Sequence, residues 1–331
     1  MARFGIQIGD FRFPAGPDSG ELFGHAAAAA RAAEDAGFTS VWVMDHLHQF
    51  PPVGERDTAM PEAFVLLGAL SQVTRTIGLG TMVAGVPYRN PAHLAKLFTT
   101  LDMVSGGRAI AGVGAGWQED EFRAYGFGDA LPPVRHRLDG LEDALRVLRA
   151  MFDAPESSVT GHRITTRGAL NVPPPVRHGG PPILVGGGGE KRLLRLVATH
   201  ADACNLFGDP DTVRHKLAVL DAHCADVGRD PAAITRTWLG GLVLADTDRE
   251  ADALAMRVAA GWGFTDLDAL ASVVVWGGPE SLRRRVTGLL EAGIDEVYFA
   301  SGVHAWTPET VAAAGEALRP LMSPGDRALG G

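Results

Sequence analysis

Short runs of apolar residues divide the chain, and each run is followed by at least one stretch with helical periodicity. Most of the runs are continuously apolar, whereas a strand with one face in water alternates apolar and polar residues. Continuous runs are typical of a parallel sheet that is covered on both faces. We therefore predict buried parallel strands at residues 4–9, 40–45, 77–83, 109–114, 182–186, 202–206, 236–244 and 296–300.

The repeated order of strand and helix predicts an α/β fold in which the units close into a (β/α)₈ TIM barrel. No second composition regime divides the 331 residues, so residues 1–322 are predicted to form a single domain. A doubly wound open sheet is the alternative, because it also alternates strands and helices. The first strand argues against it, since Gly9-Asp10-Phe11-Arg12 follows in place of a GxGxxG loop.

Two segments are too long for plain barrel loops. Residues 153–181 are rich in proline and are predicted to be an insertion, with a small hairpin around residues 162–171. Residues 261–278 contain two tryptophans and form a second insertion. Either insertion could roof an active site. The tail at residues 323–331 is rich in Gly, Pro and Ala and is expected to be flexible.

The charge balance narrows the range of partners. Lys and Arg number 30 and Asp and Glu number 39, which gives a formal net charge of −9. An acidic chain repels nucleic-acid phosphates and anionic lipids, so we expect neither nucleic acid nor membrane as a partner. The two cysteines, Cys204 and Cys224, are too few for a disulfide framework. We therefore expect reduced thiols in a cytoplasmic protein.

Four consecutive glycines, Gly186, Gly187, Gly188 and Gly189, lie between the predicted fifth strand and a helix predicted over residues 190–200. In a barrel, the carboxyl ends of the strands carry function. Glycine amides can approach an anion closely, and a helix N-terminus favours negative charge. A phosphate cradle is the favoured interpretation. A tight turn that needs positive φ angles is the alternative.

A second group of glycines, Gly112, Gly114 and Gly116, alternates along the predicted fourth strand. They could form a floor where a flat ring or a phosphate comes close. They could equally mark crowding inside the barrel that excludes side chains.

The second predicted strand ends in Asp45-His46. A histidine at this place can bind a substrate or exchange a proton near neutral pH. Alternatively, Asp45 caps loop amides and His46 packs in the rim. His48 lies close by in sequence, but there is no clear third ligand and no HExxH motif, so no metal site is expected.

A glycine-lined mouth with an anion cradle suits a large planar cofactor that carries a phosphate. In their order and spacing, the strand ends resemble the luciferase-like flavin and deazaflavin oxidoreductases, and most closely the branch that depends on coenzyme F420. The resemblance extends from about Phe4 to Met322. Its marks are the runs Val41 to His46, Ile77 to Val83, Tyr88-Arg89-Asn90-Pro91, Leu101 to Arg108, Gly112 to Trp117, Pro182 to Gly189 and Ala201 to Leu206.

The resemblance implies a cofactor across the barrel mouth, supported by a non-proline cis peptide that matches Met82-Val83. It places Asp45 and His46 near the reactive ring edge as the catalytic pair. Arg192 and Arg195 are the candidates for binding the acidic tail of F420. The implied cofactor-binding set is Thr81, Met82, Val83, Gly114, Gly116, Trp117, Gly186, Gly187, Gly188, Gly189 and Asn205.

The resemblance thus predicts an F420-dependent oxidoreductase that transfers a hydride between C5 of the deazaflavin and an unidentified small organic substrate. Sugar-phosphate dehydrogenases of the family carry a glutamate where this chain has Trp117, which argues against that particular activity. One alternative is an FMN-dependent, two-component monooxygenase with the same barrel. Another is a non-catalytic flavin-binding subunit. The resemblance also implies a homodimer, and the helices predicted at 61–73 and 92–104 have enough apolar surface to pack a neighbour as well as the barrel.

Overall fold

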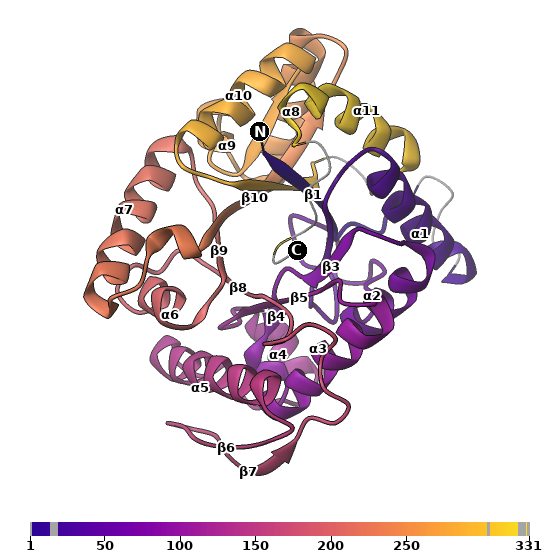
Figure 1. Cartoon of the computed structure of the whole chain (residues 1–331). Helices are drawn as coiled ribbons and strands as arrows, with labels where there is room; N and C mark the ends of the chain where they lie inside the picture. The colour runs from indigo at the N-terminus through magenta and orange to yellow at the C-terminus, as the bar shows by residue number, and fades with distance from the viewer. Residues whose placement is uncertain (1, 14–18, 303–304, 324–328, 330–331) are drawn as a thin grey trace.

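The computed structural model describes residues 2–13, 19–302, 305–323 and 329. Its main sheet has ten strands, of which all but β4 (Ala84–Gly85) and β11 (Val274–Gly277) form a closed parallel barrel (Figure 1). The barrel closes because β1 pairs with both β2 and β12, while β10 pairs with both β9 and β12. The predicted (β/α)₈ barrel is therefore confirmed. Its strands are β1 (Arg3–Ile8), β2 (Ser40–Val43), β3 (Gly78–Thr81), β5 (Ala109–Gly114), β8 (Ile183–Gly186), β9 (Ala203–Leu206), β10 (Thr235–Leu244) and β12 (Glu296–Ser301).

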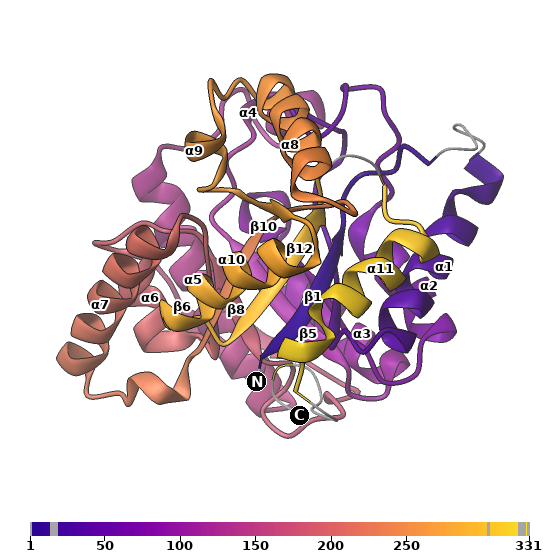
Figure 2. The ribbon, with the colours of Figure 1, turned by 90° about the horizontal axis from the view of Figure 1, so that it is seen from above.

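Helices surround the barrel on its outer side (Figures 1 and 2). Several have strong start and stop signals: Asp209 and Thr247 accept hydrogen bonds from amides of the first helical turn, and Gly106 and Gly228 end helices with positive φ. The helices are α1 (Ser19–Asp35), α2 (Ala63–Val73), α3 (Pro91–Ser105), α5 (Val134–Asp153), α6 (Leu193–His200), α7 (Pro210–Val227), α8 (Asp248–Trp262), α10 (Pro279–Glu291) and α11 (Pro308–Leu318).

Shorter pieces occupy the long connections. The 3₁₀ turns are η1 (Val86–Tyr88), η2 (Pro231–Ala233) and η3 (Arg319–Leu321). Two short helices, α4 (Glu119–Ala124) and α9 (Leu267–Leu270), lie, like α8, beyond the end of the barrel opposite the N-terminus (Figure 2). Strand β11 extends the sheet by pairing in parallel with the C-terminal half of β10. The predicted insertion at residues 261–278 therefore consists of the last residues of α8, followed by α9 and β11.

The proline-rich segment contains an antiparallel hairpin of β6 (Glu156–Thr160) and β7 (Thr165–Leu170). It hangs on the outer side of α5 (Figure 1), away from the barrel mouth, so it does not roof the site. The fully buried Asp143 of α5 fixes the tip by accepting bonds from the amides of His162, Arg163 and Ile164.

The barrel has one apolar layer between strands and helices and a separate one inside. Alternate residues of each strand point to opposite faces. Along β5, for example, Ala109 and Ala111 belong to the outer layer and Ile110 to the inner one. The inner layer also contains Trp42 and Tyr298, whose ring centroids are 4.7 Å apart.

Leu329 is buried in the inner layer. The rest of the predicted flexible tail, at residues 324–328 and 330–331, lies outside the described residues.

The third strand is shorter than the predicted 77–83. It ends at Thr81, and the chain then bulges before β4 resumes pairing with β5. The neighbouring strand accommodates this bulge through glycine, because a Cβ built on Gly112 would lie 1.9 Å from the Thr81 carbonyl oxygen. The Thr81 hydroxyl donates to the Gly112 carbonyl at 2.6 Å. Crowding inside the barrel therefore explains Gly112.

We expect Gly112→Ala to lower the free energy of unfolding by about 1–3 kcal/mol, because the added methyl group overpacks the bulge. The control is Gly24→Ala in α1, where a Cβ meets no atom within 4 Å. Alanine should stabilise that helix by about 0.5–1 kcal/mol. Urea denaturation measures both, and an unchanged midpoint in Gly112→Ala would contradict the close contact.

Candidate active site

A pocket of about 330 Å³ opens at the carboxyl ends of β2, β5, β8 and β9. Of the predicted site residues, Thr81 is buried beneath the pocket, and Gly188 and Gly189 lie beside it. The pocket brings together the others: Asp45, His46, Met82, Val83, Gly114, Gly116, Trp117, Gly186, Gly187 and Asn205.

The bulge after β3 forms one wall of this pocket. The peptide bond between Met82 and Val83 is cis, at the position that the family resemblance implied. The Val83 side chain fills the space where Gly114 and Gly186 lack one, since a Cβ on either glycine would lie within 3.0 Å of a Val83 methyl group. The buried side-chain amide of Gln7, on β1 and two strands away from β3, donates to the Met82 carbonyl at 3.1 Å. Barrel packing thus also accounts for Gly114.

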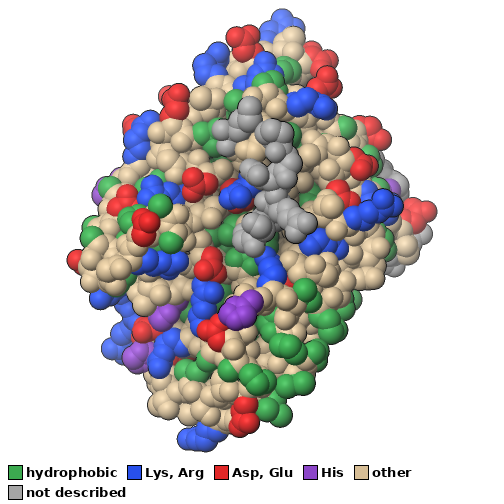
Figure 3. All heavy atoms as spheres, viewed as in Figure 1, with side chains coloured by type: hydrophobic (Ala, Val, Ile, Leu, Met, Phe, Trp, Pro, Cys, Tyr) green, Lys and Arg blue, Asp and Glu red, His purple; other side chains and the backbone are tan. Residues whose placement is uncertain are grey.

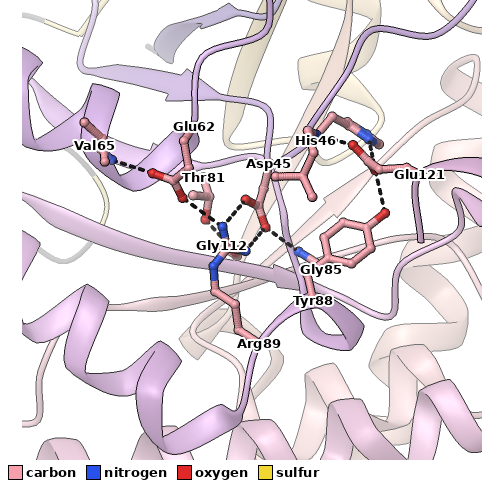
Figure 4. A network of polar contacts seen from close by, with 11 residues as sticks. Asp45, His46, Glu62, Val65, Thr81, Gly85, Tyr88, Arg89, Gly112 and Glu121 are labelled. Atoms are coloured by element: carbon pink, nitrogen blue, oxygen red, sulfur yellow. Dashed lines mark hydrogen bonds and ion pairs between the residues drawn. The ribbon is translucent and has the colours of Figure 1, made fainter. Parts of the chain in front are cut away.

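Asp45 is fully engaged with the segment that follows the bulge (Figure 4). Its buried carboxylate accepts the Gly85 amide at 2.9 Å and both terminal nitrogens of Arg89 at 2.6 and 2.8 Å. Arg89 also binds Glu62 at 2.9 Å. Burial raises the pKa of Asp45 although Arg89 opposes the shift. A carboxylate held this way by a bidentate arginine positions the surrounding loops. The geometry therefore gives Asp45 a positioning role.

His46 is held by a carboxylate that the sequence did not single out. Its Nδ1 lies 2.9 Å from Oε2 of Glu121, a fully buried residue of α4 (Figure 4). The Tyr88 hydroxyl donates to the same oxygen at 2.6 Å, and the amides of Leu47 and His48 donate to the other oxygen. One buried carboxylate thus accepts four donors.

The protonation state of Glu121 assigns the roles of the imidazole nitrogens. Burial raises the pKa of Glu121, but the hydrogen bonds from His46, Tyr88 and the Leu47 amide outweigh burial, so the net pKa lies below the ordinary value of 4.5. An ionised carboxylate only accepts hydrogen bonds, so Nδ1 of His46 carries the proton. Nε2, which has no partner among the described residues, is left for a ligand in the pocket.

The glycine run follows β8 as predicted, but the helix behind it begins later. Residues 190–192 form a turn, and α6 starts only at Leu193. The Gly187 amide bonds to the Asn205 carbonyl at 3.1 Å, and Gly187 has a φ of +129°. Within the described chain, the amides of Gly188 and Gly189 donate to no protein acceptor. These two amides could therefore hold an anion.

The cation at this cradle is Lys216. Its ammonium donates to the Gly188 carbonyl at 2.9 Å and to Glu190 at 2.5 Å. The arginines predicted for an acidic tail pair with carboxylates instead: Arg192 with Asp139 at 2.8 Å, and Arg195 with Asp226 at 3.8 Å. Only a fold that brings α7 beside the glycines could reveal Lys216.

Asn205 presents a free donor to the pocket. The residue is 1% exposed, and its Oδ1 accepts the Thr237 hydroxyl at 2.9 Å, whereas its Nδ2 has no protein partner. A buried amide donor that stays unpaired is costly, so a ligand acceptor at this position would satisfy it. Together with the free amides of the cradle, this donor fits a group that combines a ring acceptor with a phosphoryl.

Within the described residues, no three histidine, cysteine, aspartate or glutamate side chains gather closely enough to hold a metal ion. Likewise, no helix in the described part of the chain combines the length and hydropathy needed to span a bilayer. Both cysteines are free and buried.

Comparison with known proteins places these features in context. A family model described as luciferase-like monooxygenase matches residues 3–283. An uncharacterized protein of Mycobacterium tuberculosis is 35% identical over 219 residues, covering 62% of this chain and 75% of that protein. The F420-dependent glucose-6-phosphate dehydrogenase of Amycolatopsis mediterranei is 30% identical over 157 residues, covering 45% of this chain and 46% of that enzyme. The EDTA monooxygenase from Chelativorans has a TM-score of 0.81 at 16% identity, covering 97% of this chain and 93% of that chain.

Glu121→Gln should destabilise the fold by about 1–3 kcal/mol near neutral pH, because a neutral amide replaces a charged acceptor of four hydrogen bonds. A carboxyl whose native pKa is lowered stabilises the fold above its unfolded pKa and loses that contribution as the pH falls through the native pKa. The difference between wild type and variant should therefore shrink below pH 4.5.

Chemical denaturation at several pH values measures this difference. The control is Glu119→Gln, because Glu119 lies exposed on the same short helix. A destabilisation by Glu121→Gln that does not vary with pH would show that the carboxylate is not the ionised hub described above.

Proposed function

Because this chain belongs to the luciferase-like monooxygenase family, we propose that it is an oxidoreductase that uses coenzyme F420 to transfer a hydride to or from a small organic substrate. The unpaired Nδ2 of Asn205, aimed into a pocket beside two free glycine amides, is the observation that carries the proposal. These donors suit an acceptor on a tricyclic ring and the phosphoryl group attached to its side chain.

Different residues of the pocket would bind different parts of the cofactor. Gly188 and Gly189 would hold the phosphoryl through their amides, with the ammonium of Lys216 close by. Asn205 would donate to the ring, and the wall formed by Met82 and Val83 would support one ring face. These walls are set by barrel packing, so they need little rearrangement to accept the ring.

When bound, the deazaflavin supplies or accepts a hydride at C5. The chain itself manages the proton. His46 lines the pocket while its Nδ1 is held by Glu121 at 2.9 Å, so Nε2 would exchange a proton with a substrate oxygen without the imidazole turning. The ionised Glu121 stabilises the imidazolium that forms when Nε2 takes up the proton. A histidine held in this way by a buried carboxylate favours an enzyme over a non-catalytic flavin-binding subunit.

An FMN-dependent monooxygenase is the second candidate. The fold likeness to an EDTA monooxygenase and the description of the family both favour it. The named activity of the relative from Amycolatopsis mediterranei favours F420. The ring and the phosphoryl are common to both cofactors, so direct binding decides between them.

Titration of the purified protein with oxidised F420 and with FMN, followed by cofactor fluorescence, tests the proposal. We expect F420 to bind at least tenfold more tightly than FMN. Gly188→Asp should weaken F420 binding at least tenfold, about 1.4 kcal/mol, because a carboxylate would occupy the anion cradle. A Cβ at Gly188 meets only Lys216, at 3.8 Å, so the fold should tolerate the change.

Gly24→Asp is the control, since it adds the same charge where a Cβ meets no atom within 4 Å. Tight FMN binding without F420 binding would replace the deazaflavin proposal by the monooxygenase alternative. Binding of neither cofactor would overturn both.

We also propose that the chain is a homodimer that buries the outer face of α2 and α3. Helix α2 contains no charged residue, yet Val65 is 74% exposed, and Met103 and Val104 of α3 are 44% and 39% exposed. Figure 3 shows hydrophobic side chains gathered over this corner of the molecule. Exposed apolar side chains gathered on neighbouring helices are typical of a covered surface.

Val65→Asp should shift the protein from dimer to monomer in sedimentation velocity at micromolar concentration. The charge would have to be buried without a partner, which is strongly unfavourable. Val134→Asp on α5 is the matched control, because Val134 is 59% exposed and lies on another face. A wild-type protein that sediments as a monomer would refute the dimer.

A further inference from the structure

We propose that the substrate is a neutral carbonyl compound, or the matching alcohol, whose flat apolar group packs against Trp117. The inference rests on the proposed function and deepens it by naming the substrate class. It comes from two features of the pocket: an aromatic wall beside His46, and the lack of a lysine or arginine among the described residues that line it.

Three rings meet at the rim of the pocket. The ring of His46 lies 4.5 Å from that of Phe50 and 5.7 Å from that of Trp117, measured between centroids. Phe50 and Trp117 meet edge to face at 5.1 Å. Trp117 is nevertheless 58% exposed, so much of its apolar surface remains available to a flat partner.

The backbone fixes the position of this exposed tryptophan. Gly116 has a φ of +73°, which turns the chain immediately before Trp117. Arg137 donates to the Gly116 carbonyl and also to the Pro132 carbonyl, at 2.9 Å for the latter. A large apolar side chain on an anchored turn, facing a pocket, is suited to contact a ligand.

The charges around the pocket do not suit an anionic substrate. Among the described residues that line it, there is no lysine or arginine. Beneath it, Arg89 is bound to Asp45 and Glu62. At the far end, Lys216 is bound to Glu190 and belongs to the phosphoryl cradle. A phosphate or carboxylate on the substrate would therefore lose its hydration and gain no partner.

The polar group that we assign to the substrate is Nε2 of His46. In reduction, Nε2 first takes up a proton from solvent; the carbonyl carbon of the substrate then gains the hydride, and its oxygen gains the proton from Nε2. Two electrons leave the reduced deazaflavin, and the imidazole is neutral again. In oxidation, the alcohol gives its proton to Nε2 and its hydride to the oxidised deazaflavin. One polar contact next to an aromatic wall is what a neutral ketone with a flat substituent requires.

The test compares two ketones of similar size, 4-methylacetophenone and 4-acetylbenzoate, which differ in charge. Calorimetric titration of the protein loaded with oxidised F420 measures binding alone, because two oxidised partners cannot react. We expect the neutral ketone to bind at least tenfold more tightly. With reduced F420, the neutral ketone should also have a KM at least tenfold lower.

The variants separate the contact with Trp117 from general effects. Trp117→Ala should weaken binding of 4-methylacetophenone about tenfold, and Trp117→Phe should retain most of it. Trp117→Arg should strengthen binding of 4-acetylbenzoate relative to the neutral ketone. Phe23→Ala, which removes a 40% exposed aromatic side chain from α1, is the control and should change neither.

Failure of this inference differs from failure of the proposed function. If F420 binds but the charged ketone binds more tightly, or neither ketone binds, the substrate class is wrong and the cofactor proposal stands. Unchanged ketone binding in Trp117→Ala would likewise overturn the role of Trp117. If F420 itself does not bind, both proposals fall together.

Discussion

The close contact between Val83 and the glycines of two neighbouring strands determines the shape of the barrel mouth. The side chain of Val83 occupies space that side chains at Gly114 and Gly186 would need. The bulge therefore sits deep against β5 and β8, and its outer surface becomes a wall of the pocket. In an interior this closely packed, any added atom displaces its neighbours. A residue larger than glycine at either strand position would move the wall itself.

Buried carboxylates then fix the loops around this wall. Asp45 ties the end of β2 to the segment after the bulge through Gly85 and Arg89. Glu121 ties α4 to the chain just after His46 through the Leu47 amide and the imidazole. A buried polar network is stabilising only when its members are satisfied, and these two carboxylates are. The loops of the mouth consequently behave as parts of the barrel, and His46 presents one defined nitrogen.

The barrel could be predicted from sequence because its strands are continuous apolar runs that are each followed by a helix. Ten of the predicted site residues line one pocket. Glu121 escaped prediction because it stands in the acidic stretch Glu119-Asp120-Glu121, which has the pattern of an exposed helix start. Only packing shows which of the three carboxylates is buried.

The lysine that lies beside the glycines escaped prediction for a similar reason. Arg192 is close to them in sequence but pairs with Asp139, whereas Lys216 reaches Gly188 from α7. The alternating glycines were ambiguous from sequence, because crowding and ligand approach both exclude side chains. The positions of Thr81 and Val83 show that crowding is what excludes side chains at Gly112 and Gly114. Local patterns thus predict elements, while contacts between distant elements need the fold.

A crystal structure of the protein grown with F420 tests the central claim most directly. The account predicts the tricyclic ring against Met82 and Val83, with Asn205 Nδ2 donating to the ring and the phosphoryl group on the amides of Gly188 and Gly189. A ring bound elsewhere, such as in the groove of about 720 Å³ between β10, α10 and α11, would contradict it. So would a phosphoryl group that makes no contact with the glycine amides.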